Sequence, residues 1–260
     1  MIPIGGATDY VSGAFFILNC INLKTVEKGV DTELFLTYKY YSVILHCNIK
    51  GTVENMPYDY KQTHENILSS ARTQFKEKGF RDASVRNICQ SAGVTNGAFY
   101  AHFKSKEDLF GSIVEPCIEG LKELYCEEKD LCLDIKSSED IIRAFRQSYS
   151  SADSFVNYLC KHREDFLILL DCSAGSEYEN FQEDLIKTEA ASMTSFLNIS
   201  KKYVKNPGNI TENIVRLGAS FLIMTLFNGL RKGMNSEEIL KETAMVSDYC
   251  IAGYRELLGI

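Results

Sequence analysis

The pattern of apolar residues predicts helices from about residue 63 to the end of the chain. In the first helix Ile67, Ala71 and Phe75 recur every four residues, which places them on one face. Gly79 follows at a position where helices commonly end in the left-handed conformation. After residue 60 the sequence shows none of the strict alternation that marks a strand. We therefore expect this part of the chain to be all-α.

Two short helices and a longer one are expected next. Ser84 can cap the first short helix, and the second is expected to start at Thr95. Ser105 and Asp108 form a variant of the capping box, which opens the longer helix. Pro116 lies inside that helix, where its missing amide proton is expected to cause a kink.

The rest of the chain is expected to form a helical bundle. Its helices are predicted at 138–161, 163–173, 178–204, 210–231 and 236–258. The stretch 214–227 holds ten apolar residues among fourteen, so it is apolar on nearly all sides. Such a helix needs cover on two faces, and we expect the core to cover one and a second subunit the other.

Charge is distributed unevenly along the chain, whose formal net charge is −7. Residues 1–60 carry a net charge of −2, residues 61–106 carry +5, and residues 107–260 carry −10. A short basic module is therefore attached to a large acidic body. This asymmetry indicates that an acidic partner, such as nucleic acid, is bound by the module alone.

Several functional classes lack sequence support. The apolar stretch 11–23 is too short to span a membrane and no Lys or Arg precedes it, so we expect a cytoplasmic protein without a membrane partner. The nine cysteines include no C-x-x-C pair, which favours reduced thiols. Cys126 and Cys132 are either a thiol switch or, as is commoner, inert. Phosphate-loop, dinucleotide, zinc-protease and nucleophile-elbow motifs are missing, so we expect no enzyme, no cofactor and no metal.

The segment 84–103 carries the functional signal. Two short helices flank a tight turn at Ala92-Gly93-Val94, where Gly93 can take the positive φ that the turn needs. The second helix begins with small and polar residues, so it can enter the major groove of DNA. Basic side chains near the helix can then contact the phosphates. The residues that we expect at DNA are Ser84, Arg86, Thr95, Asn96, Gly97, Ala98, Tyr100, His102, Lys104 and Lys106.

Over residues 61–110 the chain resembles the TetR-type (TetR/AcrR) family of transcriptional regulators. The matching elements are Ile67, Ala71, Phe75, Gly79-Phe80, Gly93-Val94, Tyr100-Ala101-His102-Phe103 and Ser105-Lys106-Glu107-Asp108-Leu109. The resemblance implies a three-helix DNA-binding domain at 61–121 and an effector-binding and dimerisation domain at 122–260. It also implies a homodimer, held by its last two helices, that represses transcription until a small molecule releases it from an inverted-repeat operator.

The family's DNA contacts transfer to individual positions of this chain. Three positions match family phosphate contacts or the lysine that opens the fourth helix: Thr95, Tyr100 and Lys106. Three others match positions that face base edges: Asn96, Gly97 and Ala98. An Asn side chain can pair with adenine, and Ala98 can touch a thymine methyl group. His102 either contacts a phosphate or packs inside the module.

Two further sets of residues are candidates for the effector pocket and the dimer interface. The pocket candidates are Phe145, Tyr149, Phe155, Tyr158 and Phe166, although aromatic residues at helical spacing are just as often core. The interface candidates are Leu217, Phe221, Leu222, Phe227, Ile251 and Tyr254. The alternative function is that of a helical adaptor protein of the same fold without DNA binding, for which steep salt dependence of DNA binding is not expected.

Residues 1–60 show no sustained helical period, and we assign them no fold. Met56 lies at the position where members of the TetR-type family begin. A chain that starts at Met56 has 205 residues. We expect that the start of the chain is misassigned. The alternative is a genuine extension that packs on the helical body or reaches a DNA groove.

Overall fold

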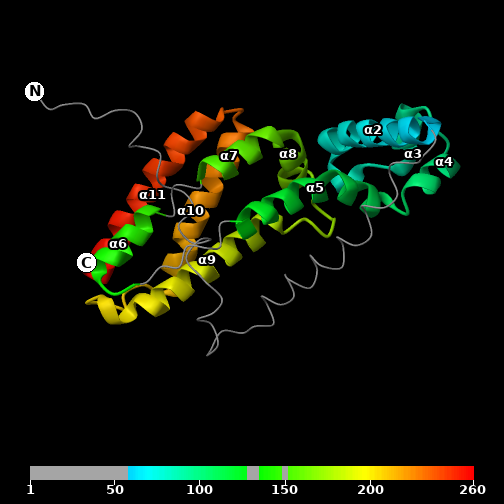
Figure 1. The fold of residues 1–260 in the computed structure, drawn as a ribbon. Helices are drawn as coiled ribbons and strands as arrows, with labels where there is room; N and C mark the ends of the chain where they lie inside the picture. The colour runs from blue at the N-terminus through cyan, green and yellow to red at the C-terminus, as the bar shows by residue number, and fades with distance from the viewer. Residues whose placement is uncertain (1–57, 128–134, 148–151) are drawn as a thin grey trace, which may run out of the picture. The chain divides into compact units, whose positions relative to one another are not determined.

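The computed structural model describes residues 58–127, 135–147 and 152–260 (Figure 1). Across these ranges the regular structure is helical, and strands do not occur in them. The described residues divide into two compact units, 58–113 and 114–260. The all-α class predicted from the sequence is therefore confirmed. The predicted start at Met56 and the residue Cys132 lie outside the described residues.

The first unit is built from three helices and the beginning of a fourth. These are α2 (Tyr58–Asp82), α3 (Val85–Ala92), α4 (Asn96–His102) and α5 (Lys106–Glu127), which continues into the second unit. The backbone of α2 leaves helical geometry at Gly79, where φ is 72°. Glycine tolerates this conformation because it has no Cβ. Helical geometry is thus interrupted at Gly79, where the sequence predicts an end, and a short helical turn follows up to Asp82.

An aromatic cluster forms the core of the first unit. The ring of Phe110 meets the rings of Phe75 and Phe80 edge-on, with centroid distances of 5.0 and 5.2 Å. Such edge-to-face pairs add to the stabilisation from burial alone. The other fully buried side chains of this unit are Ile67, Ala71, Ile88, Phe99, Leu109 and Ile113. The apolar face predicted for the first helix is therefore the face that the core buries.

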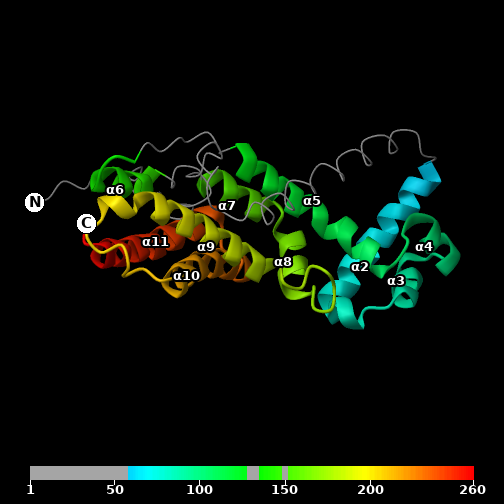
Figure 2. The same cartoon turned by 90° about the horizontal axis from the view of Figure 1, so that it is seen from below.

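The second unit is a bundle of α-helices. After α5 come α6 (Ser138–Gln147), α7 (Ala152–Lys161), α8 (Arg163–Asp171), α9 (Phe181–Ser200), α10 (Glu212–Arg231) and α11 (Ser236–Leu258), with a short 3-10 turn at Lys201–Tyr203. Helix α10 packs against both α9 and α11, and the three run side by side (Figure 2). The predicted helices at 163–173, 178–204, 210–231 and 236–258 correspond to α8, α9, α10 and α11.

The single helix predicted at 138–161 is wrong, because the structure has α6 and α7 there. Residues 148–151, between the two, lie outside the described residues.

Helix α10 is buried on one face only. Its exposed face carries Leu217, Phe221 and Met224, at 55, 45 and 46% exposure. By length and composition α10 is the one helix among the described residues that is apolar enough to cross a membrane. Half of that apolar window is buried inside the protein.

Lys106 connects the start of α5 to the end of α2. Its ammonium group donates hydrogen bonds to the carbonyl oxygens of Phe80, Arg81 and Ala83, at 2.6, 3.2 and 3.0 Å. The same nitrogen lies 4.4 Å from the centroid of the Phe80 ring. Carbonyl groups at a helix end carry partial negative charge, so a cation there is favourable. Lys106 therefore satisfies backbone groups that the end of α2 leaves unpaired.

Replacing Lys106 by Met should lower the free energy of unfolding by about 1–3 kcal/mol, because three carbonyl groups lose a charged donor. In a protein of this size that corresponds to a fall in Tm of several degrees, measured by far-UV circular dichroism. The matched control is Lys104→Met, since the Lys104 side chain is exposed. An equal fall in Tm for both variants would contradict the role given to Lys106.

Candidate nucleic-acid interface

Helices α3 and α4 form a helix-turn-helix whose turn depends on Gly93. Gly93 has φ 69° and ψ 29°, and its N–H points to the carbonyl oxygens of Cys89 and Gln90. A Cβ atom placed on Gly93 would meet nothing within 4 Å. The glycine is therefore required by backbone conformation and not by lack of space. The positive φ expected at this position is confirmed.

Side-chain hydroxyls cap both short helices, at the predicted cap Ser84 and at Thr95, where the second helix was expected to start. The Oγ of Ser84 accepts a hydrogen bond from the N–H of Asn87 at 3.2 Å. The Oγ1 of Thr95 accepts one from the N–H of Ala98 at 3.1 Å. Each hydroxyl acts here as an acceptor, so its own proton can be donated to another group such as a phosphate oxygen. Capping and phosphate contact are therefore compatible roles for both residues.

Contacts with α2 fix the position of α4. Phe99 and Phe103 of the α4 segment are buried in the first unit. The ring of His64 stacks on Phe103 with a centroid distance of 4.7 Å. At the last turn of α4, the hydroxyl of Tyr60 donates to the carbonyl oxygen of Ala101 at 3.1 Å. One side of α4 is therefore held against α2, and the opposite side is left for a partner.

His102 lies on the side of α4 that faces α2. Its ring centroid is 3.9 Å from that of Tyr60 and 5.5 Å from that of His64. Its Nδ1 is buried and has no hydrogen-bond partner. Burial, with the charge of His64 second, lowers the pKa of His102 below its usual value of 6.5. The structure therefore shows the packing role expected as one alternative for His102, and a contact of this half-buried residue with DNA stays a prediction.

The predicted DNA contacts are brought together on one module but are not equally accessible. The exposed members are Arg86, Thr95, Asn96, Gly97, Tyr100 and Lys104, while Ser84 and Ala98 are half-buried. Lys106 is half-buried and its ammonium protons are directed to three carbonyl groups. Lys106 therefore has a role in positioning α5, and its expected phosphate contact stays a prediction. Contact with DNA by the exposed residues stays a prediction.

The aromatic pocket candidates fall into two groups within the second unit. The ring of Phe145 contacts Phe196 and Tyr254, with centroid distances of 5.6 and 6.1 Å. The ring of Tyr158 contacts that of Phe166 at 6.1 Å. The remaining candidates are Phe155, which is buried, and Tyr149, which lies outside the described residues. An effector pocket formed by these residues also stays a prediction.

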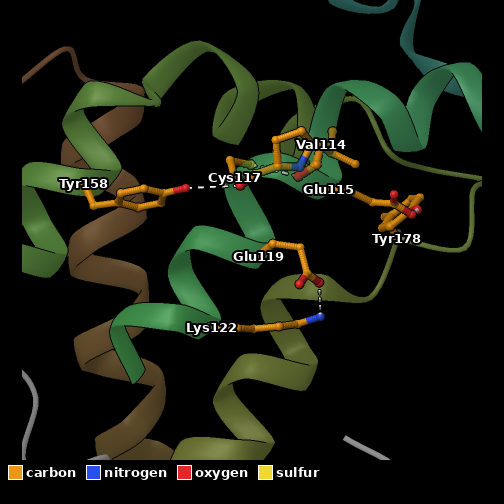
Figure 3. A network of polar contacts seen from close by, with 8 residues as sticks. Val114, Glu115, Cys117, Glu119, Lys122, Tyr158 and Tyr178 are labelled. Carbon is orange, nitrogen blue, oxygen red and sulfur yellow. Dashed lines mark hydrogen bonds and ion pairs between the residues drawn. The ribbon is translucent and has the colours of Figure 1, made fainter. Parts of the chain in front are cut away.

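Tyr158, a predicted pocket residue, also makes a hydrogen bond to α5 that the sequence analysis did not predict. Its hydroxyl donates to the carbonyl oxygen of Pro116 at 3.2 Å, in space that Gly120 leaves open (Figure 3). Burial is the main cause that raises the pKa of Tyr158 to about 12. Tyr178 donates to the carboxylate of Glu115 at 2.7 Å. Two tyrosines thus hold α5 within the second unit at adjacent residues.

The structure corrects half of the predicted interface residues. Leu222, Phe227 and Tyr254 are buried in the core of the subunit, and Ile251 is half-buried. Leu217 and Phe221 are exposed, as an interface requires. The error has a simple origin, since both faces of α10 are apolar and hydrophobicity alone does not tell inner from outer. Exposed apolar residues that the prediction missed are Met224, Met245 and Tyr249.

Glu189 is a further residue that the sequence analysis missed. It is 2% exposed and lies on the buried face of α9 with Ile186, Met193 and Phe196. The signal was present in the sequence, since a carboxylate occupies a position where the apolar spacing of α9 requires a core residue.

Comparison with known proteins identifies the module. Residues 67–113 match the family described as bacterial regulatory proteins, tetR family. The transcriptional regulator UidR of Escherichia coli K12 is 23% identical over 215 residues, which are 80% of this chain and 96% of UidR. The regulator AcrR of Shigella flexneri is 40% identical over 67 residues, 26% of this chain and 31% of AcrR.

Among solved structures, NalD of Pseudomonas aeruginosa, a repressor of a multidrug efflux pump, is 22% identical. The similarity covers 72% of this chain and 96% of NalD, with a TM-score of 0.45. The residues that match the family begin in α2 and end in α5, so they include the turn at Gly93 and all of α4. The α2–α5 module of this chain therefore matches the tetR family of bacterial regulatory proteins.

Proposed function

We propose that this protein is a ligand-responsive transcriptional regulator that binds an inverted-repeat operator as a homodimer and is released from it by a small molecule. The observation that carries the proposal is the exposed polar side of α4, a helix whose other side is fixed against α2. It lies in the stretch 61–106, whose net charge is +5. A helix that is fixed on one side and exposes small polar residues, with cations beside it, fits into the major groove of DNA.

Gly97 supports close contact between α4 and DNA. A Cβ atom at Gly97 would meet only the Oγ1 of Thr95, at an ordinary contact distance of 3.7 Å. Its φ is not in the left-handed region, so neither space nor conformation inside the subunit requires glycine. Glycine inside a helix costs about 0.5–1 kcal/mol relative to alanine. The missing side chain is therefore explained by a partner that approaches the helix closely.

The test is a selection of binding sites from random duplex DNA, followed by affinity measurements on the selected operator. Gly97→Ala should raise Tm slightly yet weaken operator binding, because the added methyl group separates the helix from the groove. Asn96→Ala should change which bases are preferred at one operator position, at a cost of about 1–3 kcal/mol for the original base.

The outcome that opposes the proposal is equally clear. Unchanged operator affinity and unchanged base preference in both variants would mean that α4 does not face DNA. The alternative of a helical adaptor without DNA binding is favoured by no observation among the described residues.

We propose further that a second copy of the chain covers the exposed apolar faces of α10 and α11. On α10 this face holds Leu217, Phe221 and Met224, and on α11 it holds Met245 and Tyr249, at 65 and 71% exposure. Contiguous apolar surface of this kind is rarely left open in a soluble monomer. Two copies would present two α4 helices to successive major grooves, about 34–36 Å apart.

Phe221→Glu should give a folded monomer with much weaker operator binding, because it places a charge in the proposed interface. Light scattering with size-exclusion chromatography measures the mass. Thr73→Glu, at an exposed position of the first unit, is the control that should stay dimeric. Leu222→Glu, at a buried position, should instead prevent folding. A folded Phe221→Glu protein that remains a dimer would rule out this interface.

The effector is proposed to bind in the second unit, with cytoplasmic action and no enzymatic reaction. A ligand that lowers operator affinity must itself be bound less tightly by the DNA-bound form, by the same factor. The aromatic residues of α6 to α8 and α11 supply the apolar surface for a small and partly apolar molecule.

A further inference from the structure

Glu189 is a carboxyl group without a partner in the core of the second unit. Its side chain is 2% exposed, and neither of its carboxylate oxygens has a hydrogen-bond partner. Burying an unpaired acid is costly, so nearly all buried polar groups in proteins are paired. Such a group lowers the stability of the subunit. It is therefore a candidate for pairing with a bound ligand that supplies the missing hydrogen-bond donors.

The surroundings of Glu189 are apolar and aromatic. On α9 it shares the buried face with Met193 and Phe196. The ring of Phe196 meets Phe145 of α6 edge-on, and Phe145 stacks with Tyr254 of α11. Glu189 lies near enough to Tyr254 to influence its hydroxyl. Three aromatic rings from three helices therefore belong to the same part of the core as this carboxyl group.

Among the described residues, no basic side chain compensates the charge of Glu189. Burial raises its pKa from 4.5 to about 8, and burial is the single cause. The titratable groups that face this region are Tyr254 and Cys250 of α11. Burial, then Cys250 and then Glu189, raises the pKa of Tyr254, and burial raises that of Cys250. At neutral pH the empty site therefore holds a mostly protonated Glu189 with neutral neighbours.

We propose that Glu189 is the polar anchor of the effector site and that the effector is a small hydrophobic amine, bound as its ammonium cation. The proposal rests on the proposed function, because it names the chemistry of the ligand that this regulator senses. An ammonium group supplies the hydrogen-bond donors and the positive charge that the carboxylate lacks. The faces of Phe145, Phe196 and Tyr254 attract a cation and cover its apolar body.

A metal ion is a poorer occupant of this position. Metal ions need several oxygen, nitrogen or sulfur ligands. The described residues contain no group of three or more His, Cys, Asp or Glu side chains that is arranged to hold one. A neutral ligand would leave the carboxyl group protonated and would gain nothing from its charge.

Binding of an ammonium cation is coupled to release of a proton. The empty site keeps Glu189 protonated up to a pH of about 8, whereas the bound cation favours the carboxylate. The affinity for an amine should therefore rise by about tenfold per pH unit below that pKa and level off above it. A neutral analogue of the same shape should show no such dependence.

The experiment is isothermal titration of the full-length protein with two amines, adamantylamine and phenethylamine, and with the matched alcohols adamantanol and phenethyl alcohol. Glu189→Gln is the variant, since it keeps the shape of the side chain and removes its charge. We expect the amines to bind Glu189→Gln about tenfold to a hundredfold more weakly than the wild type. The alcohols should bind both proteins alike, and amine binding should release a proton in buffers of different ionisation enthalpy.

Stability gives a readout that needs no ligand. The folded protein keeps the Glu189 proton up to about pH 8, whereas the unfolded chain loses it near 4.5. Wild-type stability should fall as pH rises between these values, and Glu189→Gln should lack this loss. The variant should therefore be at least as stable as the wild type at pH 8. Glu189→Met serves as a second variant if the Gln protein does not fold.

Equal binding of the amines to the wild type and to Glu189→Gln would overturn the proposal, and so would failure of both amines to bind the wild type. Operator binding by both proteins without ligand is measured on the same samples. Loss of operator binding in both proteins, with amine binding intact, would count against the proposed function and not against the amine site.

Discussion

The burial of Phe99 and Phe103 against α2 is the constraint on which the rest of the first unit depends. These two rings fix the rotation of α4 about its own axis, and with it the residues that face outward. The hydroxyl of Tyr60 adds a directional contact at the last turn of α4. Because the helix has only seven residues, it has little stability of its own, and packing must hold it in place.

Lys106 extends the same constraint to α5. Its ammonium group joins the first turn of α5 to the end of α2, so α2 positions both helices that follow the turn. Helix α5 then continues without interruption from the first unit into the second. In the second unit, Tyr178 and Tyr158 hold it at Glu115 and Pro116. A ligand that alters these contacts would act on the helix whose first residue is Lys106.

Local features of the fold were predictable from the sequence because they depend on neighbouring residues. The cap at Ser84, the positive φ of Gly93 and the apolar face of α2 each follow from spacing and residue type. The capping interaction of Ser105 with Asp108 is also present, with the N–H of Asp108 donating to the Ser105 hydroxyl at 3.0 Å. The kink predicted at Pro116 stays a prediction.

Features that depend on distant parts of the chain were not predictable in the same way. The sequence predicts a DNA contact for Lys106. It does not show that the ammonium group donates to carbonyl oxygens more than twenty residues earlier in the chain. Leu222 and Phe221 are adjacent and equally apolar, and only the packing of α10 on its neighbours separates core from surface. Glu189 was overlooked because an acidic residue is ordinarily assigned to the outside of a helix.

The most direct test of the central claim is the salt dependence of operator binding, measured by fluorescence anisotropy with a labelled duplex. If Arg86, Lys104 and the capping hydroxyls of α3 and α4 lie on phosphates, log K should fall linearly with log salt concentration. The slope should be about −0.9 for each phosphate that is neutralised. Binding that is absent, or that does not change with salt, would contradict the account of α4 as a DNA-reading helix.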